Sequence, residues 1–380
     1  MLHIERVTMR EIRLPLKEPF RISSGEVSER RIVLLELETG HGTVGWSECV
    51  AGELPNYSSE TVDMAWLAIR DWFAPRVIGS TFQHPSLVSA VLDRNICGHN
   101  MAKAAVEMGC WEVTARELGI PLSRMLGGTR DRVATGISIG IQATPTALAE
   151  RASAAFAQGY GKIKVKIEPG SDVEFVAAVR AALPTVHLMA DANSAYTLAD
   201  AEHLARLDAF DLIMLEQPLS RDDLVRHAAL QRRLKTRICL DESITSVDRA
   251  EDMIALGSGR IVNVKPGRVG GFASSMAIHD VCERNGIPVW CGGMLESGVG
   301  RAHNVALASL PNFSLPGDLS PSSRYWERDI VTPEWTMDAA GMVHVPLERP
   351  GMGVAVDMNR VDDLTVRQET IGARTSPGGS

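Results

Sequence analysis

The chain has 380 residues, of which 45% are hydrophobic and 23% charged, a globular composition that excludes a wholly disordered protein. The 39 Lys and Arg against 47 Asp and Glu give a net charge of −8, and without a basic run this argues against a nucleic-acid partner. No apolar stretch approaches the roughly 18 residues of a membrane span, the first residues lack a secretory signal, and the 6 cysteines form no CxxC pair. We therefore expect a cytoplasmic protein with reduced thiols and no membrane contact.

The first 130 or so residues predict an α+β domain in which strands come first and helices follow. Residues 32–39 and 43–50 flank a Gly-His-Gly turn, which predicts a β-hairpin. Helical patterns then cover residues 58–76 and 100–119, and the second ends on a glycine.

From about residue 134, short apolar or β-branched runs alternate with helical stretches, which predicts βαβ units and a parallel sheet. The strand-like runs are 136–141, 162–167, 187–191, 212–216, 237–241, 260–265 and 287–291, with a less regular candidate at 312–317. Seven or eight units favour a closed barrel, whereas six would also fit an open, doubly wound sheet. Residues 342–357 predict a strand and turn that return to the N-terminal domain, and the tail 375–380 is expected to be disordered.

Five successive strand-like runs each end in a charged residue, in the order Lys166, Asp191, Glu216, Asp241 and Lys265. The spacings are 25, 25, 25 and 24 residues, the size of one β/α unit of a barrel. Because the carboxyl ends of barrel strands form one face, these side chains are expected to converge there. Three carboxylates suit Mg²⁺, whereas the absence of His and Cys at these positions argues against zinc.

The two terminal lysines of this series are expected on opposite sides of the barrel mouth. With 136–141 as the first strand, Lys166 is on the second and Lys265 on the sixth, so a bound substrate would meet one ammonium group on each face. Lys164 points to the same side of its strand as Lys166, and a neighbouring cation with partial burial lowers a lysine pKa. This arrangement favours removal of a proton next to a carboxylate, with the charge stabilised by a metal.

Each of these signals also has a plain structural interpretation. The KIKVK run alone is typical of a sheet strand with one solvated face, and Asp241-Glu242-Ser243 alone is typical of a helix cap. The glycine-rich stretches 267–271 and 291–298 fit neither a dinucleotide fingerprint nor a P-loop and predict turns. The shared period and the order of the five charged residues favour the functional interpretation.

Longer stretches carry a family resemblance, among them KIKVKIEPG, DANSAYTLADA, ICLDESI, IVNVKPGRVGG and PVWCGGMLESGVGRAHNVALASLPNFSLPGD. The chain resembles the N-succinylamino acid racemase / o-succinylbenzoate synthase group of the enolase superfamily. The resemblance implies an α/β fold, a modified (β/α)8-type barrel whose α+β capping domain is formed by the N-terminal region and the C-terminal segment. It places the capping domain in residues 1–128, the barrel in 129–325 and the returning segment in 326–380.

The resemblance also implies roles for individual residues. Lys166 and Lys265 would be the acid/base pair and Lys164 the auxiliary lysine of the KxK motif. Sites of this superfamily combine a Lys or His base with Mg²⁺; here the ligands would be Asp191, Glu216 and Asp241, and Mn²⁺ or another divalent cation could substitute. The remaining matches are Glu242, which would support the metal site, and positions near the substrate: Ser138, Asn193, Gly293, Met294, Arg268, Tyr57 and Phe20.

Two activities of this group fit the same lysines: racemisation of N-succinyl or other N-acyl amino acids, and dehydration to o-succinylbenzoate in menaquinone biosynthesis. The substrate would be a small carboxylate and the protein a homo-oligomer. Arg268 could hold Lys265 as a free amine, which racemisation needs, or could simply bind solvent or a carboxylate. Dipeptide epimerases and muconate cycloisomerases share the lysine frame, but Asp318-Leu319-Ser320 lacks the second carboxylate of the epimerase Asp-x-Asp. A catalytically silent metal-binding barrel is the remaining alternative.

Overall fold

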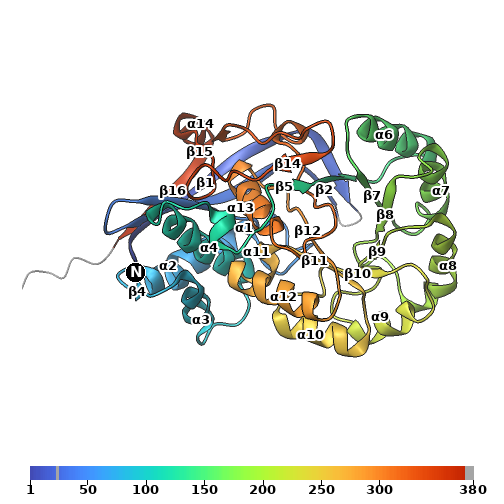
Figure 1. The fold of residues 1–380 in the computed structure, drawn as a ribbon, viewed down its shortest axis with the longest axis horizontal. Coiled ribbons are helices and arrows are strands. Elements are labelled where there is room, and N and C mark those ends of the chain that lie inside the picture. The colour runs from blue at the N-terminus through green and yellow to red at the C-terminus, as the bar shows by residue number, and fades with distance from the viewer. Residues whose placement is uncertain (23–24, 373–380) are drawn as a thin grey trace, which may run out of the picture.

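The computed structural model describes residues 1–22 and 25–372. Figure 1 shows an antiparallel sheet with its helices beside a ring of parallel strands that is surrounded by helices. The expected modified barrel with an α+β capping domain is confirmed. The tail expected to be disordered, residues 375–380, lies outside the described residues.

The capping sheet has the strand order β16-β1-β2-β3, with β4 also paired to β1. Its strands are β1 (Leu2–Ile22), β2 (Gly25–Thr39), β3 (Val44–Cys49), β4 (Thr81–Phe82) and β16 (Thr365–Gly372). The predicted hairpin is present, because the turn between β2 and β3 closes with a hydrogen bond from Gly42 N to Thr39 O of 2.9 Å. Gly42 has a φ of 77°, which suits glycine at this tight turn.

Successive side chains of β2 point to opposite faces of the capping sheet, and both faces are buried. Ile32 and Leu34 pack into the large core that continues through the barrel, whereas Val33 and Leu35 pack into a second core with the capping helices. Those helices are α1 (Val62–Ala68), the π-helical turn η1 (Ile69–Phe73), α2 (Ala74–Val77), η2 (Pro85–Leu87), α3 (Val88–Asp93), α4 (Asn100–Glu117) and α5 (Leu122–Met125). The helix predicted over 58–76 therefore begins later, at its Thr61 cap, and is interrupted by η1.

The barrel strands form a parallel sheet in the sequential order β12-β11-β10-β9-β8-β7-β6. They are β6 (Gly136–Ile139), β7 (Lys162–Lys166), β8 (His187–Asp191), β9 (Leu215–Glu216), β10 (Ile238–Leu240), β11 (Ile261–Val264) and β12 (Val289–Cys291). All seven predicted runs are confirmed as strands; β8 has the predicted bounds, and the other six are shorter than their runs.

The ring closes without an eighth strand, so the candidate run 312–317 is wrong as a strand. Asp318 N donates to Cys291 O at 2.8 Å on one side, and Gly136 N donates to Gly317 O at 2.7 Å on the other. Pro316 within this run and Pro311 just before it lack an N–H and disfavour a regular ladder. The irregular segment therefore bridges β12 and β6 and occupies the eighth position.

The outer layer of the barrel is helical, and none of the helices in the described chain is long and apolar enough to cross a membrane. Its members are α6 (Pro145–Ala157), α7 (Val173–Ala182), η3 (Leu198–Asp200), α8 (Ala201–Ala205), η4 (Arg206–Phe210), α9 (Leu224–Gln231), α10 (Val247–Leu256), α11 (Pro266–Val269), α12 (Phe272–Arg284) and α13 (Gly298–Ala308).

The C-terminal segment returns to the capping sheet later than predicted. Within 342–357, β14 (Met342–His344) pairs with β5 (Arg132–Ala134) at the start of the barrel, and β15 (Ala355–Val356) pairs with β13 (Val331–Thr332). The return is made by β16, which follows α14 (Met358–Leu364) in the chain and pairs with β1. The short helix η5 (Ser322–Arg324) precedes β13. Alternation identifies a strand but does not select its partner. The boundaries after residues 128 and 325 stay a prediction.

Candidate active site

The five charged strand ends lie at the carboxyl side of adjacent strands and are buried. Lys166, Asp191 and Glu216 stand side by side in the register of β7, β8 and β9. Asp241 and Lys265 follow directly on the last residues of β10 and β11. The structure thus brings together the residues that the 25-residue spacing predicted.

On one side of the site, Lys166 is held by two oxygen acceptors. Its Nζ donates to Asp191 Oδ2 at 2.6 Å and to Asn193 Oδ1 at 2.7 Å. The Asn193 amide in turn donates to Glu242 Oε1 at 3.0 Å, so the amide connects the lysine to the second carboxylate. Burial, with the nearby charge of Asp241, raises the pKa of Glu242 to about 7.

On the other side, the Asp241 carboxylate is shared by three donors. Lys265 Nζ lies 2.9 Å from Oδ2, and the Tyr57 hydroxyl donates to Oδ1 at 2.8 Å. Arg268 donates to the same Oδ1. Burial opposes the negative charge, but Lys265 and Arg268 outweigh burial and lower the pKa of Asp241.

Arg268 is a fixed part of the site rather than a loop arginine in solvent. It is 4% exposed, and its Nε donates to Ile244 O at 2.7 Å while Nη2 donates to Asn263 O at 2.5 Å. Burial disfavours the Lys265 ammonium, but Asp241 raises the pKa of Lys265 above its ordinary value. Arg268 competes with Lys265 for Asp241, and this competition is the physical route by which it can favour the free amine.

Beneath these groups lies a second set of charges. Its Lys164 has a predicted role, but the pairing of Lys162 and Lys164 with Asp318 was not predicted from the sequence. Asp318 accepts Lys164 Nζ at 2.6 Å and Lys162 Nζ at 3.3 Å, and Lys162 also lies 3.8 Å from the centre of the Trp290 ring. Lys164 further approaches Glu216 to 3.4 Å. Alternation in KIKVK places Lys162 on the inward face, which is the signal that could have revealed it. Asp318 could not be found this way, because its segment is not a strand.

A cavity of about 500 Å³ contains both terminal lysines of the series. Of the predicted site residues, its lining includes Lys166, Lys265, Asn193, Gly293, Met294, Tyr57 and Phe20. Ser138 is not part of this lining. It lies opposite Lys164 in the register of β6 and β7, and its buried hydroxyl has no hydrogen-bond partner among the described residues. Gly292 leaves room beside the cavity, since a Cβ there would lie 2.7 Å from Lys265 Cε.

The chemistry of the three carboxylates suits a hard divalent cation. Burial, with the charges of Asp191 and Asp241, raises the pKa of Glu216 to about 8, and carboxylate oxygens are the ligands that such a cation prefers. Lys164 lies between Asp191 and Glu216, 3.5 Å and 3.4 Å from their oxygens.

The tightest group of potential ligands within residues 1–22 and 25–372 is elsewhere, on α12. The ligand atoms of His279, Asp280 and Glu283 lie within 4.8 Å of one another. Both ring nitrogens of His279 are already engaged, by Asp280 Oδ1 at 2.8 Å and by Asn312 N at 2.9 Å. This group therefore does not compete with the barrel carboxylates as a metal site.

Two family profiles cover most of the chain. Residues 147–360 match a family described as "Enolase C-terminal domain-like" and residues 4–127 match "Mandelate racemase / muconate lactonizing enzyme, N-terminal domain". The chain belongs to the enolase superfamily. The resemblance found in its motifs is confirmed.

Similarity to individual members of the superfamily extends over nearly the whole chain. An o-succinylbenzoate synthase of Geobacillus kaustophilus is 49% identical over 367 residues, which is 96% of each chain. An N-succinylamino acid racemase of Amycolatopsis sp is 45% identical over 373 residues, 98% of this chain and all of the relative. A crystal structure of an enolase-superfamily protein from Listeria innocua superposes with a TM-score of 0.95 at 40% identity, covering 98% of this chain and 100% of that one.

A solved superfamily structure with bound ligands is also similar. A dipeptide epimerase from Cytophaga hutchinsonii, in complex with Mg and the dipeptide D-Ala-L-Val, matches with a TM-score of 0.90 at 25% identity, over 98% of this chain and 100% of that one.

Proposed function

We propose that this protein is a Mg²⁺-dependent racemase of N-succinyl and related N-acyl amino acids, with o-succinylbenzoate synthase activity at the same site. The observation that carries the proposal is the shared cavity of Lys166 and Lys265. Each lysine is anchored to a different strand-end carboxylate, Asp191 or Asp241. Racemisation needs two acid/base groups that reach one carbon from opposite faces, and this site offers two lysines.

The residue roles follow from the contacts. Lys166 would take the α-proton on one face, with Asn193 orienting its amine, and Lys265 would deliver a proton on the other. The divalent ion would be held by Asp191, Glu216 and Asp241. Its positive charge would stabilise the negative charge that develops on the substrate carboxylate when the α-proton leaves. Lys164 and Glu242 would support these groups, with Ser138 beside Lys164 in the next strand. The substrate cavity would be shaped by Phe20, Tyr57, Gly293 and Met294. Mn²⁺ or another divalent cation is proposed to substitute.

The position of Arg268 favours an enzyme that racemises its substrate over one that only dehydrates it. A dehydration needs Lys265 only as a cation, whereas racemisation also needs it as a base. Because Arg268 binds the same Asp241 carboxylate, it weakens the attraction that keeps Lys265 protonated. The same frame would serve a dipeptide epimerase or a muconate cycloisomerase. Ser320, which stands where the epimerase pattern has a second carboxylate, disfavours the epimerase.

Incubation in D₂O with Mg²⁺ tests the function directly. The substrates are N-succinyl and N-acetyl amino acids, dipeptides and the precursor of o-succinylbenzoate. Deuterium at the α-carbon together with loss of optical activity supports the racemase, and loss of water alone selects the synthase. Epimerisation of dipeptides alone selects the epimerase. Absence of exchange and of water loss with every substrate would contradict the proposal.

Three further expectations belong to this proposal. The enzyme acts in the cytoplasm, on a small carboxylate rather than on nucleic acid or a membrane, and it forms a homo-oligomer. Light scattering on the purified protein measures the oligomeric state, and a monomer at micromolar concentration would contradict it.

A further inference from the structure

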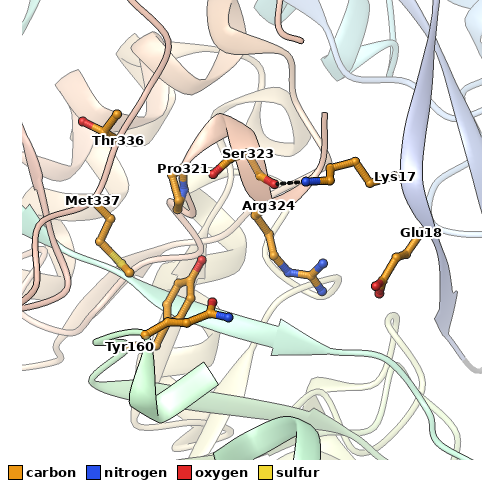
Figure 2. A pocket seen from close by; sticks show the side chains of 9 residues that line it. Lys17, Glu18, Tyr160, Pro321, Ser323, Arg324, Thr336 and Met337 are labelled. Carbon is orange, nitrogen blue, oxygen red and sulfur yellow. Dashed lines mark hydrogen bonds between the residues drawn. The ribbon is translucent and has the colours of Figure 1, made fainter. Parts of the chain in front are cut away.

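A second cavity, of about 550 Å³, lies between the capping sheet and the barrel (Figure 2). Its lining is largely polar and comes from β1, from the loop between α6 and β7, from the segment around η5 and from the segment after β13. The polar side chains that line it are Lys17, Glu18, Gln158, Tyr160, Ser323, Arg324 and Thr336. No residue is common to this lining and to that of the cavity with Lys166 and Lys265.

Arg324 is the feature of this cavity that calls for a ligand. It is half-buried, and its Nε is fully enclosed without a hydrogen-bond partner in the described part of the chain. In Figure 2 its guanidinium extends into the space between Glu18 and Tyr160. No carboxylate among the described residues pairs with this guanidinium. Because Nε itself is enclosed, the groups that can reach a ligand are the two Nη atoms, and the planar guanidinium can present their N–H bonds to two oxygens of an oxyanion at once.

A second cation faces the same space from the capping domain. Lys17 Nζ donates to the backbone oxygen of Ser323 at 3.2 Å and has no carboxylate partner among the described residues. The acid in the lining, Glu18, is already paired with Arg151 at 3.1 Å. The remaining charge of the cavity is therefore positive, which favours an anionic ligand.

We propose that this cavity binds a small oxyanion, a carboxylate or a phosphate group, with Arg324 as the bidentate donor and Lys17 as the second cation. The Gln158 amide and the Ser323 hydroxyl line the same space and are available as further donors. The ligand is small and soluble, because the lining offers separate polar groups rather than an extended apolar face.

The position of the cavity gives the ligand a means to act on the active site. The backbone N of Lys17 donates to Tyr325 O at 2.9 Å, so this part of β1 already docks on the barrel. Phe20, three residues further along β1, lines the cavity that contains the two lysines. An anion held by both Lys17 and Arg324 would bridge the two domains and fix the β1 segment that carries Phe20. This consequence rests on the proposed function, whereas the binding does not.

Crystals of the full chain soaked in selenate test the location of binding. Anomalous scattering is expected to place selenium within hydrogen-bonding reach of both Arg324 and Lys17 in the wild type, and not in Arg324→Met. Occupancy elsewhere only, or none, would overturn the proposal. Lys17→Met provides a second variant on an exposed side chain, should Arg324→Met fail to fold.

Calorimetric titration with inorganic phosphate and with succinate distinguishes the two ligand chemistries. Loss of a charged bidentate donor is expected to weaken binding about tenfold or more in Arg324→Met. Arg226→Met, an exposed arginine on α9 outside the cavity, should leave it unchanged. Equal weakening in both variants, or failure of both anions to bind, contradicts the site. If selenate binds at Arg324 but the protein shows no racemisation, the proposed function is contradicted and the anion site is still supported.

Discussion

The carboxylate of Glu107 in the capping domain accepts a hydrogen bond of 2.8 Å from the backbone nitrogen of Phe272, and so caps barrel helix α12. The helix lacks a side-chain cap of its own, because Gly271 precedes it. A Cβ at Gly271 would lie 2.3 Å from the Glu107 carboxylate, so the approach requires glycine. Glu48 of β3 plays the same part for α13, where it accepts from Gly300 N at 3.0 Å. Two capping-domain carboxylates thereby join the domains.

Glu107→Ala should destabilise the protein by about 2 kcal/mol, because the substitution removes a helix cap and leaves buried N–H groups without an acceptor. Chemical denaturation measures the free energy of unfolding. Glu150→Ala, at an exposed position of α6, is the matched control and should change it little. Equal effects of the two substitutions would contradict the role of the cap.

The contribution of Glu48 and Glu107 to stability should fall as the pH rises from about 4.5 to about 7. Burial raises the pKa of both Glu48 and Glu107 from 4.5 to about 7, so between these values the folded state binds protons that the unfolded state has released. Each group contributes a slope of up to about 1.4 kcal/mol per pH unit. Glu107→Gln removes one such group and should flatten the curve of unfolding free energy against pH. A curve that keeps its slope in this variant argues against the raised pKa.

Lys166→Ala and Lys265→Ala should each lower the rate of racemisation by about a hundredfold or more, since each removes one general acid/base group. Circular dichroism should show that the fold is retained. Lys235→Ala, at an exposed position outside the cavity, should leave the rate unchanged. Near-normal racemisation by either of the first two variants would rule out the two-lysine mechanism.

Asp241→Asn should abolish the activity, so that adding a divalent ion no longer produces any. The substitution takes one charged oxygen from the proposed ligand set and leaves Lys265 and Arg268 without their shared carboxylate. Calorimetric titration with Mg²⁺ should detect weaker binding than in Asp252→Asn, an exposed position of α10. Full activity of the wild type in the presence of a chelator would contradict the metal assignment.

Asp318→Asn should destabilise the barrel by about 3 kcal/mol, because breaking a buried ion pair leaves its partners uncompensated. Lys162 would lose its carboxylate, whereas Lys164 would keep Asp191 and Glu216. Adding Lys162→Met removes the uncompensated charge and should restore part of the stability. Unfolding experiments on the single and double variants measure this coupling, and strictly additive losses would show that the two residues act independently.

The sequence by itself determined the chemistry of this protein. Apolar runs at one period identified seven strands, and the charge that ends five of them predicted which lysines and carboxylates meet. This inference works because the carboxyl ends of parallel barrel strands lie on one face. Residues that end successive strands are therefore close in space although they are about 25 residues apart in the sequence. The family motifs lie on the same segments.

Only the tertiary structure decided the partners. Asp318 reaches Lys164 from a segment without strand periodicity, and Tyr57 reaches Asp241 from a capping-domain loop 184 residues away. The pairing of β14 with β5, and the capping of α12 by Glu107, likewise join segments that no local pattern connects. Periodicity specifies which face a side chain occupies, whereas the group that it meets depends on how distant segments pack.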